Sequence, residues 1–166
     1  MLSEITRLSP LVVRVLGLNP GPFTLQGTNT YLVGRGSTRI LIDAGEGRPG
    51  YLPLLLRAIR QAGAESLSDV IITHYHHDHS EGLRDLQRHF GPSLRAWKAQ
   101  PLFEGPHGPS FSLKDVLALE DAQRLKAADG SATLRIVFTP GHTKDHVCLL
   151  LEEEGSLFAG TSLSAL

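Results

Sequence analysis

Four of the chain's eight histidines and one aspartate lie together in Thr-His-Tyr-His-His-Asp-His, residues 73–79. His74 and His76 are two positions apart, so on an extended segment both rings leave the same side and can bind one ion. Asp78 and His79 come where the chain should turn into a helix, so they point elsewhere and can serve a second ion. Imidazole and carboxylate ligands suit Zn²⁺ best among the common ions, although iron and manganese also accept them.

The residues on either side of this run argue for a built metal site rather than a loose histidine tract that binds metals by accident. Residues 69–72, Asp-Val-Ile-Ile, predict a buried strand before the run. Residues 80–82, Ser-Glu-Gly, mark the predicted start of a helix after it. A strand, then the donors, then a helix start is the setting that a metal-binding loop needs.

A three-histidine zinc site needs one more donor beside His74 and His76. His142 is the candidate, because it follows a predicted buried strand and a Pro-Gly turn that would present its ring at a strand end. The alternative is that His142 is a turn residue bonded to the backbone. His146 is expected either to orient one of the metal ligands or to be an ordinary loop residue.

Size and composition indicate one soluble globular domain. The chain has 166 residues, of which 41% are hydrophobic and 20% are charged. Its net charge of −1 gives no overall attraction to nucleic acid or to an anionic membrane. The single cysteine, Cys148, excludes an internal disulfide framework, and its apolar neighbours place it in the core.

The sequence predicts an intracellular protein, cytoplasmic or mitochondrial, without a membrane partner. No apolar run is long enough to cross a bilayer, and the N-terminus lacks the basic-then-apolar pattern of a secretory signal. Arg7 and Arg14 have few acidic neighbours, which hints at a transit peptide, although Glu4 interrupts this pattern.

The elements that must position the donors alternate between strands and helices. Apolar and β-branched runs predict strands over residues 11–18, 28–33, 37–42, 70–73, 94–98, 133–139, 147–152 and 156–159. The spacing of apolar residues predicts helices over 50–61 and 80–90. Residues 115–129 fit either a helix or a strand plus turn. Strands with interspersed helices predict an α/β layered domain.

The run from His74 to His79 matches the motif H-x-H-x-D-H, and the sequence therefore resembles the metallo-β-lactamase superfamily. Residues 140–143, Pro-Gly-His-Thr, match that family's next histidine motif. Asp43 stands where the family has an aspartate that supports the metal loop. Residues 19–31 look closest to the branch called β-lactamase-like protein two, which includes endoribonucleases, and similar fungal enzymes are thioesterases acting on carrier-protein polyketides.

The resemblance implies a fold and a set of metal ligands. The fold is α/β, a metallo-β-lactamase-like αββα sandwich, of which residues 1–166 would form the N-terminal part as a single, incomplete domain. The implied ligands of the first zinc ion are His74, His76 and His142. In such proteins two ions hold a hydroxide, which attacks a carbonyl carbon or a phosphorus atom.

Asp78 and His79 would bind the second ion, and Asp78 would also act in catalysis by orienting the attacking water. The chain departs from the family at this second ion. It has Thr161 where the family has an aspartate that bridges both ions, and it reaches Leu166 without the family's late histidine. We therefore expect one bound zinc rather than two. Absent C-terminal strands would leave apolar surface and a sheet edge open, which favours an oligomer or docking of a missing C-terminal segment.

Three functions remain open on these grounds. One is a zinc-dependent hydrolase that acts as an endoribonuclease on single-stranded RNA. A basic surface for RNA would consist of Arg84, Arg88, Arg95 and Lys98. The alternative is that these four residues are ordinary solvated charges. Another is a thioesterase-type hydrolase with a small-molecule substrate. The third is a truncated, non-catalytic chain that binds at most one metal ion.

Overall fold

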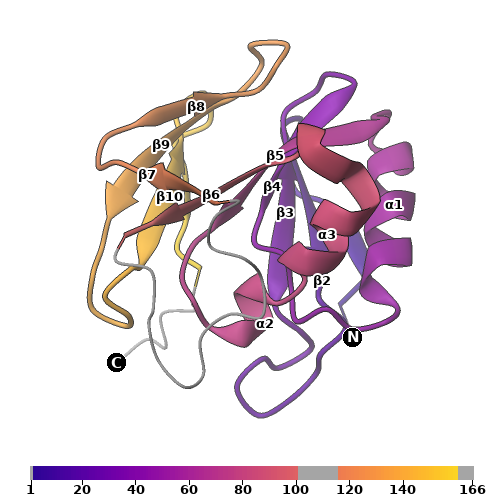
Figure 1. The fold of residues 1–166 in the computed structure, drawn as a ribbon. Helices are drawn as coiled ribbons and strands as arrows, with labels where there is room; N and C mark the ends of the chain where they lie inside the picture. The colour runs from indigo at the N-terminus through magenta and orange to yellow at the C-terminus, as the bar shows by residue number, and fades with distance from the viewer. Residues whose placement is uncertain (1, 101–115, 161–166) are drawn as a thin grey trace.

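The computed structural model describes residues 2–100 and 116–160, which form two packed β-sheets with helices on one outer face (Figure 1). The helices are α1 (Tyr51–Gln61), α2 (His77–Ser80) and α3 (Leu83–Phe90), followed by the short 3-10 helix η1 (Gly91–Ser93). None of the helices in the described ranges is both long and apolar enough to cross a bilayer. The predicted α/β layered class is confirmed.

The larger sheet has seven strands whose order in space follows their order in the chain. They are β1 (Ile5–Arg7), β2 (Val12–Leu16), β3 (Asn29–Val33), β4 (Thr38–Ile42), β5 (Ser66–Ile72), β6 (Arg95–Ala99) and β7 (Val116–Leu119). From β1 to β4 each strand pairs antiparallel with its neighbour, whereas from β4 to β7 neighbouring strands pair parallel. Helix α1 connects β4 to β5, and α2 and α3 connect β5 to β6. The C-terminal ends of these parallel strands therefore meet at one edge, where α/β sheets usually bind their ligands.

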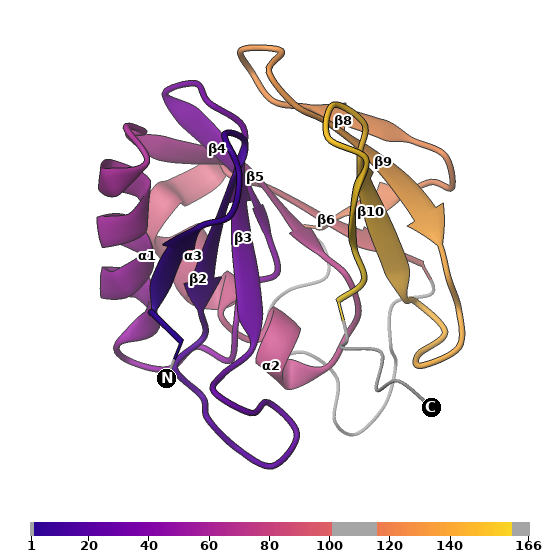
Figure 2. The same ribbon diagram turned by 180° about the vertical axis from the view of Figure 1, so that it is seen from behind.

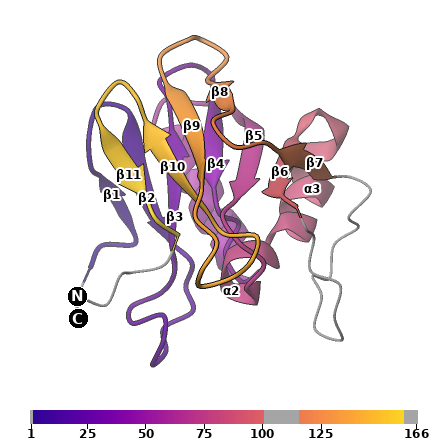
Figure 3. The same ribbon diagram turned by 90° about the vertical axis from the view of Figure 1, so that its left-hand side faces the viewer.

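The smaller sheet packs on the face opposite α1 and α3, as Figures 2 and 3 show. Its antiparallel strands are β8 (Arg124–Lys126), β9 (Thr133–Phe138), β10 (Val147–Leu151) and β11 (Ser156–Phe158). Within residues 2–100 and 116–160, no helix covers the outer face of this sheet. The described chain therefore supplies the helix, sheet and sheet layers of the expected αββα sandwich.

Two apolar clusters hold the three layers together, one on each face of the larger sheet. On β4, Leu41 packs with Leu55 on the helical side, while Ile40 and Ile42 pack toward the smaller sheet. The strand is buried on both faces because successive side chains point to opposite sides. Each such aliphatic side chain contributes roughly 1.5–3 kcal/mol on burial, which makes this sheet a firm base for the loops at its edge.

The helix predicted over 80–90 is interrupted in the structure. Helix α2 ends at Ser80, and α3 begins only at Leu83. The break lies at Gly82, whose N–H donates to the Gly45 carbonyl at 3.0 Å. The sequence pattern missed this break because its cause is a contact with a distant loop.

The remaining predicted elements are confirmed, with three differences. Strand β5 begins earlier than predicted, at Ser66, and β1 was not predicted at all. Residues 115–129 fitted either a helix or a strand plus turn, and their described part, from residue 116, contains two strands, β7 and β8. Both strands are short and partly exposed, so their sequences carry little of the alternation that marks a strand.

Gly82→Ala should destabilise the chain, because a Cβ at this position would lie 2.0 Å from the Ala44 carbonyl oxygen. Relief requires a backbone shift in the loop after β4, so we expect the free energy of unfolding to fall by about 1–3 kcal/mol. Gly141→Ala is the control, since a Cβ there meets nothing within 4 Å. Urea denaturation measures both variants, and a Gly82→Ala midpoint equal to that of the wild type would contradict this packing.

Candidate metal centre

Three histidine rings converge at the edge where the larger sheet meets the β9–β10 loop. His74 and His76 follow β5, and His142 lies in that loop. His76 Nδ1 lies 3.1 Å from His74 Nε2 and 3.0 Å from His142 Nε2. The three donor atoms lie within 4.8 Å of one another, and the described residues hold no other such group of three or more histidine, cysteine or carboxylate donors. The structure thus brings together the residues that the sequence assigned to the first ion.

The donor set fits a zinc ion. Zn–N bonds of ~2.0–2.1 Å in a tetrahedral site place two ligand nitrogens roughly 3.3 Å apart, close to the two short contacts in the structure. His74 is buried, His76 is half-buried and His142 is exposed, so the centre opens to solvent on the His142 side. Three protein ligands with one open position are the arrangement of catalytic zinc sites.

Hydrogen bonds at the strand end fix which nitrogen of His74 faces the other rings. The Asp43 carboxylate can only accept, so the Thr73 hydroxyl donates its proton to Asp43 Oδ1 at 2.9 Å. Thr73 Oγ1 then accepts from His74 Nδ1, which lies 3.0 Å away. The lone pair of His74 is therefore on Nε2, the atom that faces His76.

The two histidines after β5 are held in the neutral form that a metal ion requires. Burial, helped by the neighbouring rings of His79 and His76, lowers the pKa of His74 to about 2. Burial also lowers the pKa of His76, and the His142 ring adds to this effect. An ion entering the centre at neutral pH would not have to displace a proton from either ring.

Asp78 and His79 lie beside the three converging histidines. His79 Nε2 is 3.2 Å from Asp78 Oδ2, and His79 Nδ1 is 2.7 Å from Asp43 Oδ2. Burial lowers the pKa of His79, but the Asp43 and Asp78 carboxylates outweigh burial and raise it to about 10. Burial opposes ionisation of Asp78, yet hydrogen bonds from His79 and Thr28 hold the pKa of its carboxyl below its usual value. A second ion on this pair would have to displace a proton from His79, which agrees with the expectation of one bound ion. The assignment of Asp78 and His79 as ligands stays a prediction.

Asp43 sits where a residue that supports the metal loop should sit. It follows β4 with a left-handed backbone, φ 59°, and it is buried. Its carboxylate accepts from the Thr73 N–H at 2.8 Å as well as from the Thr73 hydroxyl and His79. One side chain therefore fixes both ends of the segment that carries His74 and His76.

His146, the other residue considered for orienting a ligand, contacts the base of its own loop. Its Nδ1 lies 2.8 Å from Thr139 Oγ1, and its ring centroid is 5.4 Å from that of His74. His146 is buried, and both alternatives for it stay predictions. Thr161, where the family motif has a bridging aspartate, lies outside the described residues.

A buried ion pair that sequence reasoning missed joins Lys98 of β6 to Asp145 of the β9–β10 loop. Lys98, which the sequence offered either for a basic surface or as an ordinary solvated charge, is fully buried, so both alternatives are wrong for it. Arg95 of the same strand is paired with Asp69 at 2.8 Å. The available signal was Lys98 itself, which lies in the strand predicted over residues 94–98. A lysine buried in such a strand needs a partner of opposite charge.

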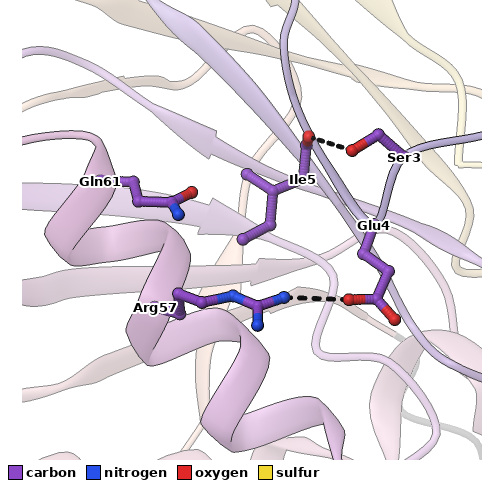
Figure 4. A pocket seen from close by; sticks show the side chains of 5 residues that line it. All are labelled: Ser3, Glu4, Ile5, Arg57 and Gln61. Carbon is purple, nitrogen blue, oxygen red and sulfur yellow. Dashed lines mark hydrogen bonds and ion pairs between the residues drawn. The ribbon is translucent and has the colours of Figure 1, made fainter.

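Two surface pockets flank the larger sheet. One, of about 230 Å³, adjoins Asp78 and is lined mainly by residues 19–24 of the β2–β3 loop, with His77. The other, of about 270 Å³, lies between β1 and α1 and has no histidine in its lining (Figure 4). The ion pair between Arg57 and Glu4, 2.9 Å long, crosses this second pocket. The first pocket reaches Asp78 and His77, whereas none of the three converging histidines lines either pocket.

The family model of the metallo-beta-lactamase superfamily matches residues 23–165. The chain belongs to this superfamily. The match includes the run at 74–79 and His142, so the histidines that converge in the structure lie within the matched region.

Curated relatives from this superfamily match nearly the whole chain. The atrochrysone carboxyl ACP thioesterase dmxR1 of Cryptosporiopsis sp. is 44% identical over 162 residues, which are 98% of this chain and 46% of that protein. Thioesterase pkgB of Emericella nidulans is 47% identical over 156 residues, which are 94% of this chain and 42% of that protein. The chain therefore spans less than half the length of these relatives.

Solved metallo-beta-lactamases have the same fold. The soil-metagenome enzyme MEM-A1 superposes with a TM-score of 0.69 at 23% identity, covering 93% of this chain and 60% of that chain. BJP-1 of Bradyrhizobium japonicum gives a TM-score of 0.70 at 18% identity, covering 99% of this chain and 64% of that chain. These similarities confirm the metallo-β-lactamase-like fold that the sequence motifs implied.

Asp43→Asn should weaken the fold while it preserves the left-handed backbone, because asparagine tolerates positive φ. The amide loses the charge that pairs with His79 and one acceptor oxygen that Thr73 uses. We expect the free energy of unfolding of the metal-free chain to fall by about 1–3 kcal/mol. The control is Asp129→Asn, an exposed aspartate bonded to Ser131. Equal urea midpoints for Asp43→Asn and the wild type would show that Asp43 does not hold the loop.

Proposed function

We propose that this chain binds one zinc ion through His74, His76 and His142 and hydrolyses acyl thioesters. The observation that carries the proposal is the convergence of three imidazole nitrogens within 4.8 Å of one another. The relatives that are named thioesterases, at 44% and 47% identity, indicate the substrate class.

Zinc in this centre would lower the pKa of water toward ~7 and polarise a carbonyl oxygen. Asp78 is placed to assist, because its ionised carboxylate lies beside the histidines and lines the adjoining pocket. It can accept a hydrogen bond from a water molecule and hold that water for attack on a carbonyl carbon. Thr28 donates to Asp78 Oδ2 at 2.8 Å and so fixes the direction of the carboxylate.

The pocket beside Asp78 favours an apolar acyl group. In the β2–β3 loop, Phe23 is 99% exposed and Leu25 is 72% exposed, so a bound acyl chain would cover apolar surface that otherwise meets water. Arg48 at the pocket is paired with Glu46 at 3.0 Å. An RNA backbone requires free cations for its phosphates, and this pocket offers none beyond that pair among its described lining residues.

The RNA-cleaving alternative finds little support elsewhere on the described surface. Of the arginines and lysine considered from the sequence, Lys98 is buried and Arg88 lies 3.6 Å from Asp85. Arg95 is paired with Asp69. Cleavage of single-stranded RNA is therefore the competing result in the activity test.

The wild-type chain should retain one zinc ion per chain after dialysis, as elemental analysis would show. His142→Ala should weaken zinc binding by more than the ~10–100-fold that changes around a metal ligand usually cause, because it removes a ligand itself. His89→Ala, an exposed histidine on α3, is the matched control and should bind zinc like the wild type. Two tightly held zinc ions, or unchanged affinity in His142→Ala, would contradict the proposed centre.

The zinc-loaded chain should hydrolyse an acyl thioester of N-acetylcysteamine. Colorimetric detection of the released thiol measures the rate. His76→Ala or prior removal of zinc with a chelator should reduce hydrolysis to the uncatalysed rate, whereas His89→Ala should keep it. Cleavage of single-stranded RNA in place of the thioester would favour the endoribonuclease. A chain that binds zinc but cleaves neither substrate is the non-catalytic alternative.

A further inference from the structure

Lys98 and Asp145 form an ion pair that is shut off from solvent, with Lys98 0% and Asp145 3% exposed. Such a pair is a weak source of net stability, because each ion loses several kcal/mol of hydration on burial, roughly what the pairing returns. Buried ion pairs in some proteins instead determine which arrangement of segments the chain adopts. The position of this pair shows which segments it would arrange.

The pair lies at the sheet edge that carries the histidines. Lys98 is in register with Ile72, the last residue of β5, and His74 follows two positions later. Asp145 lies in the β9–β10 loop, three positions after His142. The ion pair therefore ties the segment that carries the third histidine to the sheet that carries the other two.

Within the described residues, His142 has few other restraints on its position. Its side chain is exposed, and the contacts found for it are with other histidine rings. The loop is closed at its base by the bond from the Thr139 N–H to the His146 carbonyl at 3.0 Å. It is joined to the larger sheet by the bond from the Val147 N–H to the Thr73 carbonyl, also 3.0 Å. Within the loop, the Gly141 N–H donates to the Thr143 carbonyl at 3.1 Å, which fixes the turn around His142 but does not attach it to the larger sheet.

We propose that the Lys98–Asp145 ion pair is a positioning element of the metal centre, holding the β9–β10 loop so that His142 Nε2 stays within binding reach of His74 and His76. This inference rests on the proposed zinc site. Neither Lys98 nor Asp145 binds the ion or touches substrate. Their effect is exerted through the loop, as the second attachment that stops its pivoting about Val147.

Three variants separate positioning from plain stability. Lys98→Met and Asp145→Asn each remove one charge and leave the other buried without a partner, so both should lower the free energy of unfolding. The double variant Lys98→Met/Asp145→Asn removes both charges and should recover much of that stability. Asp69→Asn is the control. This buried aspartate pairs with Arg95 where the pairing of β5 and β6 begins, at the opposite end from Lys98.

Three measurements apply to each variant: urea unfolding of the metal-free chain, zinc affinity by competition with a coloured chelator, and the visible absorption of the Co²⁺-loaded chain. We expect zinc affinity to fall about tenfold or more in both single variants, as for other residues that orient a metal ligand. It should stay low in the double variant although stability recovers. The Co²⁺ bands typical of four-coordinate sites should weaken in parallel. Asp69→Asn should lose stability and keep wild-type zinc affinity.

A folded double variant with wild-type zinc affinity and Co²⁺ absorption would overturn the positioning role. If a single variant does not fold, the measurement on the double variant alone decides between the two outcomes. Wild-type chain that binds no zinc would overturn the proposed function and this inference together. Wild-type chain that binds zinc, with variants that bind it equally well, would overturn this inference alone.

Discussion

The contact between the two sheets at one edge is the constraint on which the metal centre depends. His74 and His76 extend from a strand of the larger sheet, whereas His142 lies in a loop of the smaller one. Three nitrogens can share an ion only if the sheets keep their relative position to within a few tenths of an ångström, given bonds of ~2 Å. The apolar cluster between the sheets supplies most of the attraction but little direction, because dispersion and hydrophobic contacts are non-directional. At the edge that carries the histidines, the directional contacts include the Val147–Thr73 hydrogen bond and the Lys98–Asp145 ion pair.

Three buried polar residues at this edge, Asp43, Thr73 and His74, are joined by hydrogen bonds. Asp43, Thr73 and His74 are each at most 1% exposed, and burial of such groups without partners would cost several kcal/mol. The Asp43 carboxylate instead accepts from Thr73 and from His79, and Thr73 in turn accepts from His74. This chain of bonds fixes the tautomer of His74 before any ion arrives. Pre-orientation of this kind lowers the entropy cost of metal binding and favours neutral nitrogen donors.

The sequence predicted the parts that depend on local pattern. The strand before His74 was predictable because Val70, Ile71 and Ile72 form an apolar run, and two histidines at alternate positions follow it closely. His142 was predictable because a strand and a Pro-Gly turn precede it. The meeting of the three rings depends on how the two sheets are arranged. Local spacing cannot show this arrangement, and the resemblance to the family motif implied it.

The parts that were missed depend on contacts between distant segments. The break at Gly82 arises because its N–H donates to the Gly45 carbonyl in a distant loop, and the neighbouring Ala44 carbonyl leaves no room for a side chain there. The Lys98–Asp145 pair joins residues from different sheets, and nothing near Asp145 in sequence distinguishes it from an exposed loop aspartate. His79 stays a predicted metal ligand, but the sequence did not show that its ring lies between the carboxylates of Asp43 and Asp78. Charge pairing of this sort becomes visible only when the fold brings the partners together.

The most direct test of the central claim is a crystal structure of the zinc-soaked chain with the ion located by anomalous diffraction at the zinc edge. The account predicts one strong anomalous peak at bonding distance from His74 Nε2, His76 Nδ1 and His142 Nε2, the atoms that already face one another. A peak held by Asp78 and His79 with the His142 ring turned away, or no peak at this edge of the sheets, would contradict it.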